Sequence, residues 1–359
     1  VFTQSAFRAA PVLIAEPRIQ AGGIRALLIN SGNANAATGE PGMEDALSLC
    51  RAAATALDVP EDAVLPFSTG VIGERLPVAA MAQVIESLPD GLDGGNWLQA
   101  AEAIMTTDTV AKAASLQIEL DGQTVTLTGM AKGSGMIRPD MATMLAYVCT
   151  DAAVSPDCLQ RLLVRATAAS FNRITVDGDT STNDAFILAA TGQAGNGMID
   201  DPTSSEADVL LEGLISIART LAQAIVRDGE GATKFVTVAV EGGANETECL
   251  QVAYTIAHSP LVKTALFASD PNWGRLAMAI GRAGIEHLDP AGVQVFFDDV
   301  QVMHNGLMYP GYSEEAGAEV LAAEEFTIRV QLGRGAAAAE VWTSDLSYEY
   351  VRINAEYRT

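Results

Sequence analysis

The stretch from Ala131 to Thr150 reads AKGSGMIRPDMATMLAYVCT. It begins as a glycine-rich turn, passes Pro139, and continues as a short apolar run that predicts a buried strand. Thr143 stands at the start of that strand, directly after Ala142. A threonine at the start of a strand is usually structural, so this position alone does not establish any chemistry.

A hydroxyl at this position could still be a nucleophile. A threonine hydroxyl is weak unless a base takes its proton, and the three histidines are scattered along the chain without the spacing of a triad or a metal site. The other available base is the α-amine of the threonine itself, which is released when the preceding peptide bond is cut. The small side chain of Ala142 and the glycine-rich approach would let Thr143 attack that bond, so self-cleavage is one hypothesis.

Around this stretch, short apolar runs alternate with helical patterns, which predicts an α/β protein with mostly antiparallel sheets between helices. The predicted strands are Val12–Ala15, Arg25–Asn30, a hairpin of Ser115–Leu120 and Gln123–Thr128 with an Asp-Gly turn, Phe235–Gly242 and the tail Leu346–Tyr357. The predicted helices are Met43–Leu57, a long one from about Ser204 to Ile225, and helical stretches within Ser259–Gly284.

Composition excludes several classes of protein. The net charge of −24, from 21 basic and 45 acidic residues, argues against nucleic acid as a partner. No uninterrupted apolar run approaches the length of a membrane span and no signal peptide is recognisable, so we expect a cytoplasmic protein. The four cysteines lack a Cys-x-x-Cys spacing and predict free thiols in a reducing compartment. The acidic surface fits either a high-salt habitat or an ordinary acidic enzyme.

Two further motifs fail on inspection. GSGMIR begins like a dinucleotide-binding loop, but its sixth position is Arg138 instead of glycine. DGDTSTND, from Asp177 to Asp184, begins like a calcium loop, but Thr182 occupies the position that requires glycine. We therefore predict neither a dinucleotide nor a metal site.

Seven segments, taken in order, resemble the ornithine acetyltransferases, also called bifunctional glutamate N-acetyltransferases. They are PFSTGVIGERLP (66–77), AIMTTDT (103–109), MAKGSGMIRPDMATMLAYVCTDA (130–152), FNRITVDGDTSTND (171–184), RDGEGATKF (227–235), DPNWGRLAMAIGRAG (270–284) and NAEYRT (354–359). The resemblance covers essentially the whole chain and includes the Thr143 stretch.

The resemblance implies the αββα-like sandwich of self-cleaving Thr hydrolases, with a second, smaller α/β lobe within about residues 235–345. It also implies a precursor cut between Ala142 and Thr143 into an α chain of residues 1–142 and a β chain of residues 143–359, assembled as α2β2. The implied reaction moves the acetyl group of N-acetylornithine to glutamate in cyclic arginine biosynthesis, without a metal or organic cofactor. Use of acetyl-CoA as a further donor stays open.

The same resemblance implies roles for individual residues. Thr143 is the nucleophile, and Thr69 with the Gly70 N–H forms the oxyanion hole. The residues implied for substrate binding, besides Thr143, are Lys132, Glu230, Asn354, Thr359 and either Thr106 or Thr107. Two alternatives remain: a self-processing amidohydrolase or aminopeptidase that passes the acyl group to water, and an uncut binding protein with the same fold.

Overall fold

A computed structural model of the protein describes residues 1–138 and 144–356. The chain divides into two compact units. Of the described residues, unit 1 comprises Val1–Asn172 and Asp179–Ile225, and unit 2 comprises Arg173–Gly178 and residues 226–356. Each unit has its own strands and its own core, so each is described by itself.

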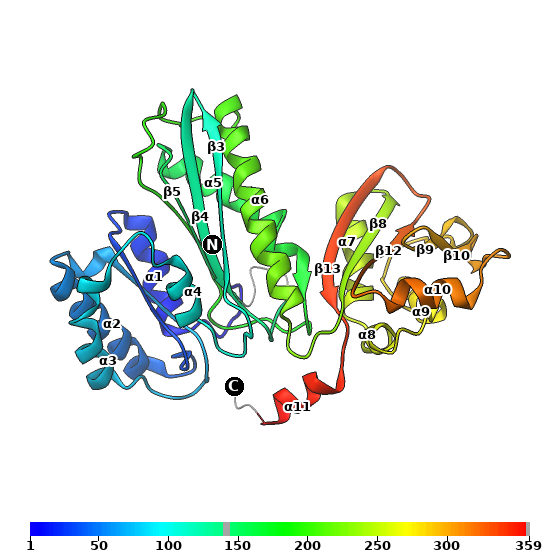
Figure 1. The fold of residues 1–359 in the computed structure, drawn as a ribbon, viewed down its shortest axis with the longest axis horizontal. Coiled ribbons are helices and arrows are strands. Elements are labelled where there is room, and N and C mark those ends of the chain that lie inside the picture. The colour runs from blue at the N-terminus through cyan, green and yellow to red at the C-terminus, as the bar shows by residue number, and fades with distance from the viewer. Residues whose placement is uncertain (139–143, 357–359) are drawn as a thin grey trace. The chain divides into compact units, whose positions relative to one another are not determined.

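Unit 1 holds two sheets and the helices that cover them (Figure 1). Its helices are α1 (Ala10–Ala21), α2 (Gly39–Leu57), α3 (Val78–Ile85), α4 (Trp97–Ala103), α5 (Pro156–Ala168) and α6 (Ser205–Arg227, whose last two residues belong to unit 2). Its strands are β1 (Ala26–Asn30), β2 (Val64–Ser68), β3 (Lys112–Leu120), β4 (Gln123–Lys132), β5 (Leu145–Thr150) and β7 (Ala185–Ala190). The parallel pair β1–β2 forms one sheet, and the order β3-β4-β5-β7 forms the other.

The layers of unit 1 follow from the alternation of side chains along its strands. On β2, Val64 packs with α2 and α3, whereas Leu65 and Phe67 face the larger sheet. On β5, Leu145 and Tyr147 meet that layer, and the Tyr147 ring lies edge-on to Phe67 at 5.2 Å. The order of layers is therefore helix, sheet, sheet, helix, with the first sheet reduced to two strands. This confirms the predicted αββα-like sandwich.

Helix α6 forms part of the outer helical layer beside β3 and β4 (Figure 1). A Cβ added to Gly213 of α6 would lie 3.1 Å from Ile118 of β3, and one added to Gly129 of β4 would lie 3.2 Å from Leu221 of α6. Within the described residues, α6 is the one helix long and apolar enough to cross a membrane by length and composition. Burial against the sheet accounts for its apolar side.

Several predictions from local sequence are confirmed. The hairpin β3–β4 turns at Asp121 and Gly122, both with positive φ (52° and 72°), as a two-residue turn of this kind requires. The run after Thr143 is strand β5, which pairs with β4 and β7. The cysteines are free thiols, three buried and Cys149 half-buried. The sheets of unit 1 include the parallel pairs β1–β2 and β5–β7, so the antiparallel expectation holds only in part.

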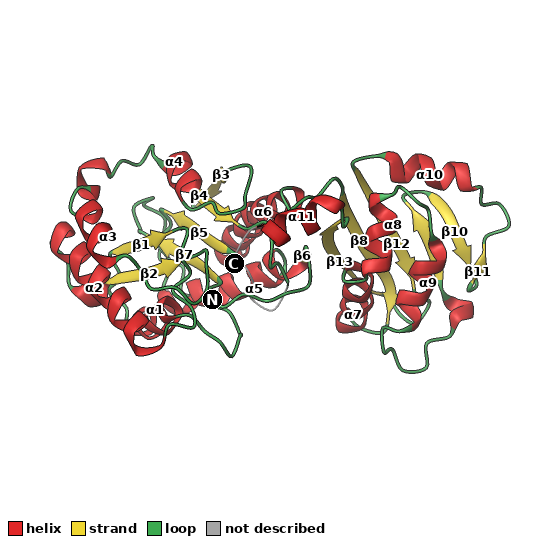
Figure 2. Cartoon of the chain, turned by 90° about the horizontal axis from the view of Figure 1, so that it is seen from below, coloured by secondary structure: helices red, strands yellow, loops and turns green. Residues whose placement is uncertain are grey.

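Unit 2 is a seven-stranded sheet with helices packed against one face (Figure 2). Its strand order is β11-β10-β9-β12-β8-β13-β6. The strands are β6 (Ile174–Thr175), β8 (Phe235–Gly243), β9 (Gln294–Phe297), β10 (Val300–His304), β11 (Leu307–Met308), β12 (Glu325–Gln331) and β13 (Ala337–Ser344). The helices are α7 (Glu246–Ala257), α8 (Pro260–Phe267), α9 (Trp273–Gly281), α10 (Glu314–Ala322) and α11 (Tyr348–Glu356).

The predicted strand Val12–Ala15 was wrong, because these residues belong to helix α1. Val12, Ile14 and Ala15 are buried. A four-residue apolar run cannot be told from one side of a buried helix by periodicity alone. The deciding signal was Pro11 in the first turn, where its missing N–H costs no hydrogen bond.

The predicted strand at the C-terminal tail was also wrong, because Tyr348–Glu356 is helix α11. The Ser347 hydroxyl accepts hydrogen bonds from the N–H groups of Glu349 (3.1 Å) and Tyr350 (3.4 Å), which is how a serine caps a helix start. The alternation that suggested a strand does not reflect burial, since Tyr348 is 82% exposed. Asn354 therefore lies on a helix and not at the rim of a sheet.

Candidate active site

Lys132 lies at the carboxyl end of β4, where the antiparallel register places it opposite Leu145 at the start of β5. Its side chain is only 10% exposed. Thr143 and Ala142 lie outside the described residues. Met144, the next residue along the chain, is buried, and its carbonyl accepts a hydrogen bond from the Ala185 N–H at 3.1 Å. The residues that follow the predicted cleavage site are thus held in the sheet β3-β4-β5-β7, opposite Lys132.

The Lys132 ammonium donates hydrogen bonds to two threonine hydroxyls, Thr106 Oγ1 at 2.8 Å and Thr69 Oγ1 at 3.3 Å. Thr69 directly follows β2, and Thr106 lies in the loop after α4. Three segments that are distant in sequence therefore meet at one cation. Sequence alone did not decide between Thr106 and Thr107. Thr106 is the one bonded to Lys132, and Thr107 is half-buried at the next position.

The turn at Gly70 admits no side chain. Its φ of +128° disfavours any other residue, and an added Cβ would lie 2.3 Å from the Gly32 carbonyl carbon and 2.5 Å from the Asn33 nitrogen. The buried Asn183 amide supports this turn by donating to the carbonyls of Ser68 (2.8 Å) and Ala34 (2.6 Å). Backbone packing therefore fixes the turn that carries Thr69 and Gly70.

Asp108 completes this cluster and was not predicted. Its carboxylate is fully buried, lies 3.8 Å from the Lys132 ammonium and accepts a hydrogen bond from Lys112 at 2.8 Å. Burial alone would raise the pKa of Asp108, but the charges of Lys132 and Lys112, with the Gly133 N–H, lower it below its ordinary value. An acid between two hydroxyl residues and four residues before a lysine was the signal available in the sequence.

In unit 2, Glu230 and Asn354 are in direct contact. The Asn354 amide donates to Glu230 Oε2 at 2.7 Å and to the Tyr350 carbonyl at 3.0 Å. Gly231 makes this approach possible, because its φ is +66° and a Cβ there would lie 2.5 Å from the Tyr350 nitrogen. The Ser347 hydroxyl also donates to the Gly231 carbonyl at 2.6 Å. The start of α11 is thus fastened to the turn that carries Glu230.

A second buried lysine lies in unit 2. The Lys263 ammonium donates to Thr343 Oγ1 at 3.1 Å and to the Ser344 carbonyl. Desolvation lowers its pKa from 10.5 to about 8, against the opposing effect of Asp345 and Asp177. Asp345 accepts the backbone N–H groups of Thr233 (2.8 Å) and Lys234 (2.9 Å). Lys263 therefore contributes to the hydrogen bonds that hold the carboxyl end of β13.

The predicted site residues thus form two groups, one in each unit. Lys132, Thr69, Gly70 and Thr106 lie in unit 1, and Glu230 with Asn354 lies in unit 2. Thr359, like Ala142 and Thr143, lies outside the described residues. The first group offers a cation and hydroxyls, which suit an anionic oxygen, and the second offers a carboxylate, which suits an ammonium group.

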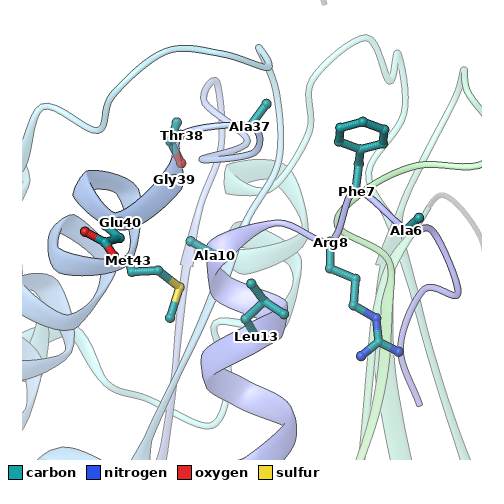
Figure 3. Close-up of a pocket in the computed structure, with 10 residues that line it drawn as sticks. All are labelled: Ala6, Phe7, Arg8, Ala10, Leu13, Ala37, Thr38, Gly39, Glu40 and Met43. Carbon is teal, nitrogen blue, oxygen red and sulfur yellow. The ribbon is translucent and has the colours of Figure 1, made fainter.

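A separate hollow of about 370 Å³ lies in unit 1 beside the starts of α1 and α2 (Figure 3). Apolar side chains of Phe7, Leu13 and Met43 contribute to its lining. None of the predicted site residues lines it. It is therefore distinct from the Lys132 cluster. Among residues 1–138 and 144–356, no group of three or more His, Cys, Asp or Glu side chains is placed to hold a metal ion.

Comparison with known proteins identifies close relatives. The chain matches the ArgJ family over residues 1–359. It is 54% identical to the arginine biosynthesis bifunctional protein ArgJ of Pseudomonas syringae pv. tomato, across 100% of this chain and 88% of that protein. The protein of the same name from Pseudomonas fluorescens is 53% identical with the same coverage. The crystal structure of the ArgJ protein of Bacillus halodurans matches with a TM-score of 0.57 and 41% identity, covering 60% of this chain and 100% of that chain.

Proposed function

The chain belongs to the ArgJ family and is an acetyltransferase of arginine biosynthesis, and we propose that it moves the acetyl group of N-acetylornithine to glutamate through an ester on Thr143. The observation that carries this proposal is the cluster of Lys132, Thr69 and Thr106, opposite the start of β5. It gathers a cation and hydroxyls beside the strand that follows the proposed nucleophile.

In the proposed reaction, Thr143 Oγ attacks the acetyl carbonyl while its own α-amine takes the hydroxyl proton. The C–N bond of N-acetylornithine breaks, and ornithine leaves with that proton. The amine of glutamate then attacks the acetyl-Thr143 ester, Thr143 Oγ regains a proton, and N-acetylglutamate is released. The bonds formed and broken balance without a metal or an organic cofactor, and acetyl-CoA is a further proposed donor to glutamate.

The remaining roles follow from charge and donor type. Thr69 and the Gly70 N–H stabilise the negative oxygen that develops in each step. Lys132 binds the substrate carboxylate and Glu230 binds the substrate ammonium. Asn354 orients Glu230, Thr106 supplies a hydroxyl in preference to Thr107, and Thr359 completes the proposed binding set. The rigid turn at Gly70 and the Asn354–Glu230 hydrogen bond support these assignments.

We further propose that the chain cuts itself between Ala142 and Thr143 and that the products assemble as α2β2 in the cytoplasm. Residues 143–359 are 217 of the 359 residues, or about 60% of the chain, and the solved Bacillus halodurans chain also matches 60% of this chain along its full length. The agreement of these two shares supports the proposal of a separate β chain. Within the described residues, Met144 and Leu145 are held in the sheet and provide a fixed end for the β chain.

Intact-mass analysis of wild type, Thr143→Ala and Thr143→Ser, each with an acetyl-transfer assay, tests this proposal. We expect two fragments for wild type, one uncut 37.5 kDa chain without activity for Thr143→Ala, and cleavage with reduced transfer for Thr143→Ser. A Thr143→Ala chain that is still cut would move the cleavage site elsewhere. Ornithine release that does not depend on glutamate would indicate a hydrolase, and assays with N-acetylornithine or acetyl-CoA separate the two donors.

A further inference from the structure

We propose that Asp108 and Lys112 are positioning residues: Asp108 aims the Lys132 ammonium, and Lys112 offsets the charge of Asp108 so that the cluster stays positive. This inference rests on the proposed function, in which Lys132 binds the substrate carboxylate. Neither residue is among those that the family resemblance implied for the site. Asp108 acts on the substrate through Lys132 and Thr106, and Lys112 acts through Asp108 and Lys132.

The contacts of Asp108 show how it aims Lys132. Oδ1 accepts hydrogen bonds from Lys112 Nζ (2.8 Å) and from the Gly133 N–H (2.7 Å). Oδ2 accepts the Thr106 N–H at 3.1 Å and faces the Lys132 ammonium at 3.8 Å. One carboxylate therefore joins the end of β4 to the loop that carries Thr106. This explains why the Thr106 hydroxyl and the Lys132 ammonium lie within 2.8 Å of each other.

Lys112 decides the charge of the cluster. Its side chain is 2% exposed, and its ammonium donates to Asp108 and to the Val110 carbonyl at 3.1 Å. Asp108, Lys112 and Lys132 together carry two positive charges and one negative charge. Without Lys112, the negative charge of Asp108 would cancel the positive charge of Lys132. The cluster would then have no net charge to attract a substrate carboxylate. A buried charge that is compensated by a close partner can stay ionised, as Asp108 does here.

The two residues consequently affect the site in opposite directions. Lys112→Met lowers the net charge of the cluster from +1 to 0, and Asp108→Asn raises it to +2. The Lys112→Met change weakens carboxylate binding. The Asp108→Asn change removes the negative charge that Asp108 supplies to both ammonium groups, which favours loss of a proton at lower pH. Asp108→Asn/Lys112→Met restores +1, carried by Lys132 alone. The double variant is therefore the decisive one.

The experiment measures kcat and KM for N-acetylornithine against pH for wild type, both single variants and the double variant, with cleavage checked by mass. For Lys112→Met we expect a KM about tenfold higher, with little change in kcat. For Asp108→Asn we expect the alkaline loss of activity to begin about one pH unit lower. In the double variant that alkaline limit should return to its wild-type position, and KM should recover most of the tenfold loss.

A merely structural role predicts a different result: the double variant would show the product of the two single losses, with no displacement of the pH profile. That result would overturn the proposal. Lys112→Arg, which keeps the charge, should retain a KM near wild type and keeps the test available if Asp108→Asn fails to fold. Glu248→Gln is the control, because Glu248 forms a partly buried ion pair with Arg334 at 2.7 Å in unit 2, away from the Lys132 cluster. It should lower stability without changing KM.

Failure of the proposed function has a separate signature. If wild type, correctly cleaved, transfers no acetyl group from N-acetylornithine, the substrate assignment is wrong whatever the variants do. If wild type is active but Lys112→Met leaves KM unchanged, the charge argument is wrong and the proposed function stands.

Discussion

The two buried lysines of this protein, Lys132 in unit 1 and Lys263 in unit 2, have opposite surroundings. Lys132 is 8% exposed, lies near the carboxylate of Asp108 and contacts two hydroxyls. Lys263 is 3% exposed and donates to a hydroxyl and a carbonyl. Within the described residues, no carboxylate lies at ion-pair distance from Lys263. One lysine has a compensated charge, and the other has been desolvated without a close counter-charge.

The consequence is a different dependence on pH in the two units. Asp108 has a lowered pKa, so its contribution to stability is present above the ordinary carboxyl pKa and is lost as pH falls through its lowered value. Lys263 also has a lowered pKa, but for a lysine this means that the folded state resists protonation. Its charge destabilises the fold below about pH 8, and that cost disappears as pH rises toward 10.5. A close counter-charge offsets the cost of burying the charge of a lysine.

The largest expected effect comes from Gly70→Ala. This change displaces the backbone turn at Gly70, which lies in the same unit as Lys132. A Cβ there would overlap Gly32 and Asn33, so the turn must move and both proposed oxyanion donors move with it. We expect kcat to fall by about 10³-fold or more. Gly73→Ala is the control, because Gly73 also has positive φ (85°) but nothing within 4 Å of an added Cβ. Equal losses for both variants would contradict the oxyanion role.

Thr69→Ala removes one hydroxyl without moving the backbone. We expect kcat to fall by about 10²-fold to 10³-fold with KM nearly intact, because the oxyanion exists only as the acetyl carbonyl reacts. Steady-state kinetics with N-acetylornithine and glutamate measure both constants. An unchanged kcat would assign Thr69 to the support of Lys132 alone.

Lys263→Met tests the buried lysine of unit 2, and the expected effect is on the free energy of unfolding. The stability of wild type relative to Lys263→Met should rise by about 2 kcal/mol between pH 7 and pH 9.5, as the folded state no longer has to hold the proton that the unfolded state binds. Urea unfolding of both proteins at the two pH values measures this difference. A difference that does not vary with pH would mean that burial leaves the pKa of Lys263 at its unfolded value, and the contrast with Lys132 would be lost.

The smallest expected effect concerns Asn354, which lies in the same unit as Lys263 but belongs to the proposed substrate site. Asn354→Ala removes the hydrogen bond to Glu230 and should raise KM for N-acetylornithine about tenfold, with self-cleavage intact. Arg352→Ala on the same helix breaks only exposed ion pairs and should leave KM as it is. Parallel behaviour of the two variants would remove Asn354 from the site.

The elements that could be predicted were those whose signal lies within a few residues. The Asp-Gly turn between β3 and β4, the apolar stripe of α2 and the acidic start of α6 each have a local cause, and all three appear in the structure. Val12–Ala15 and the tail failed because a short apolar run or an alternating pattern fits more than one element. In both cases a helix-start signal, Pro11 or Ser347, was the better guide.

The sequence by itself indicated the family and the order of most elements, and it predicted which residues form the site, because short motifs keep residue types and spacing together. Only the tertiary structure decided which of those residues meet. Thr69, Thr106 and Lys132 are 26 to 63 residues apart, and Glu230 and Asn354 are 124 residues apart. Only the fold revealed Asp108 and Lys263, because burial and counter-charge are properties of the packed interior. No local pattern records how far a lysine lies from water or from a carboxylate.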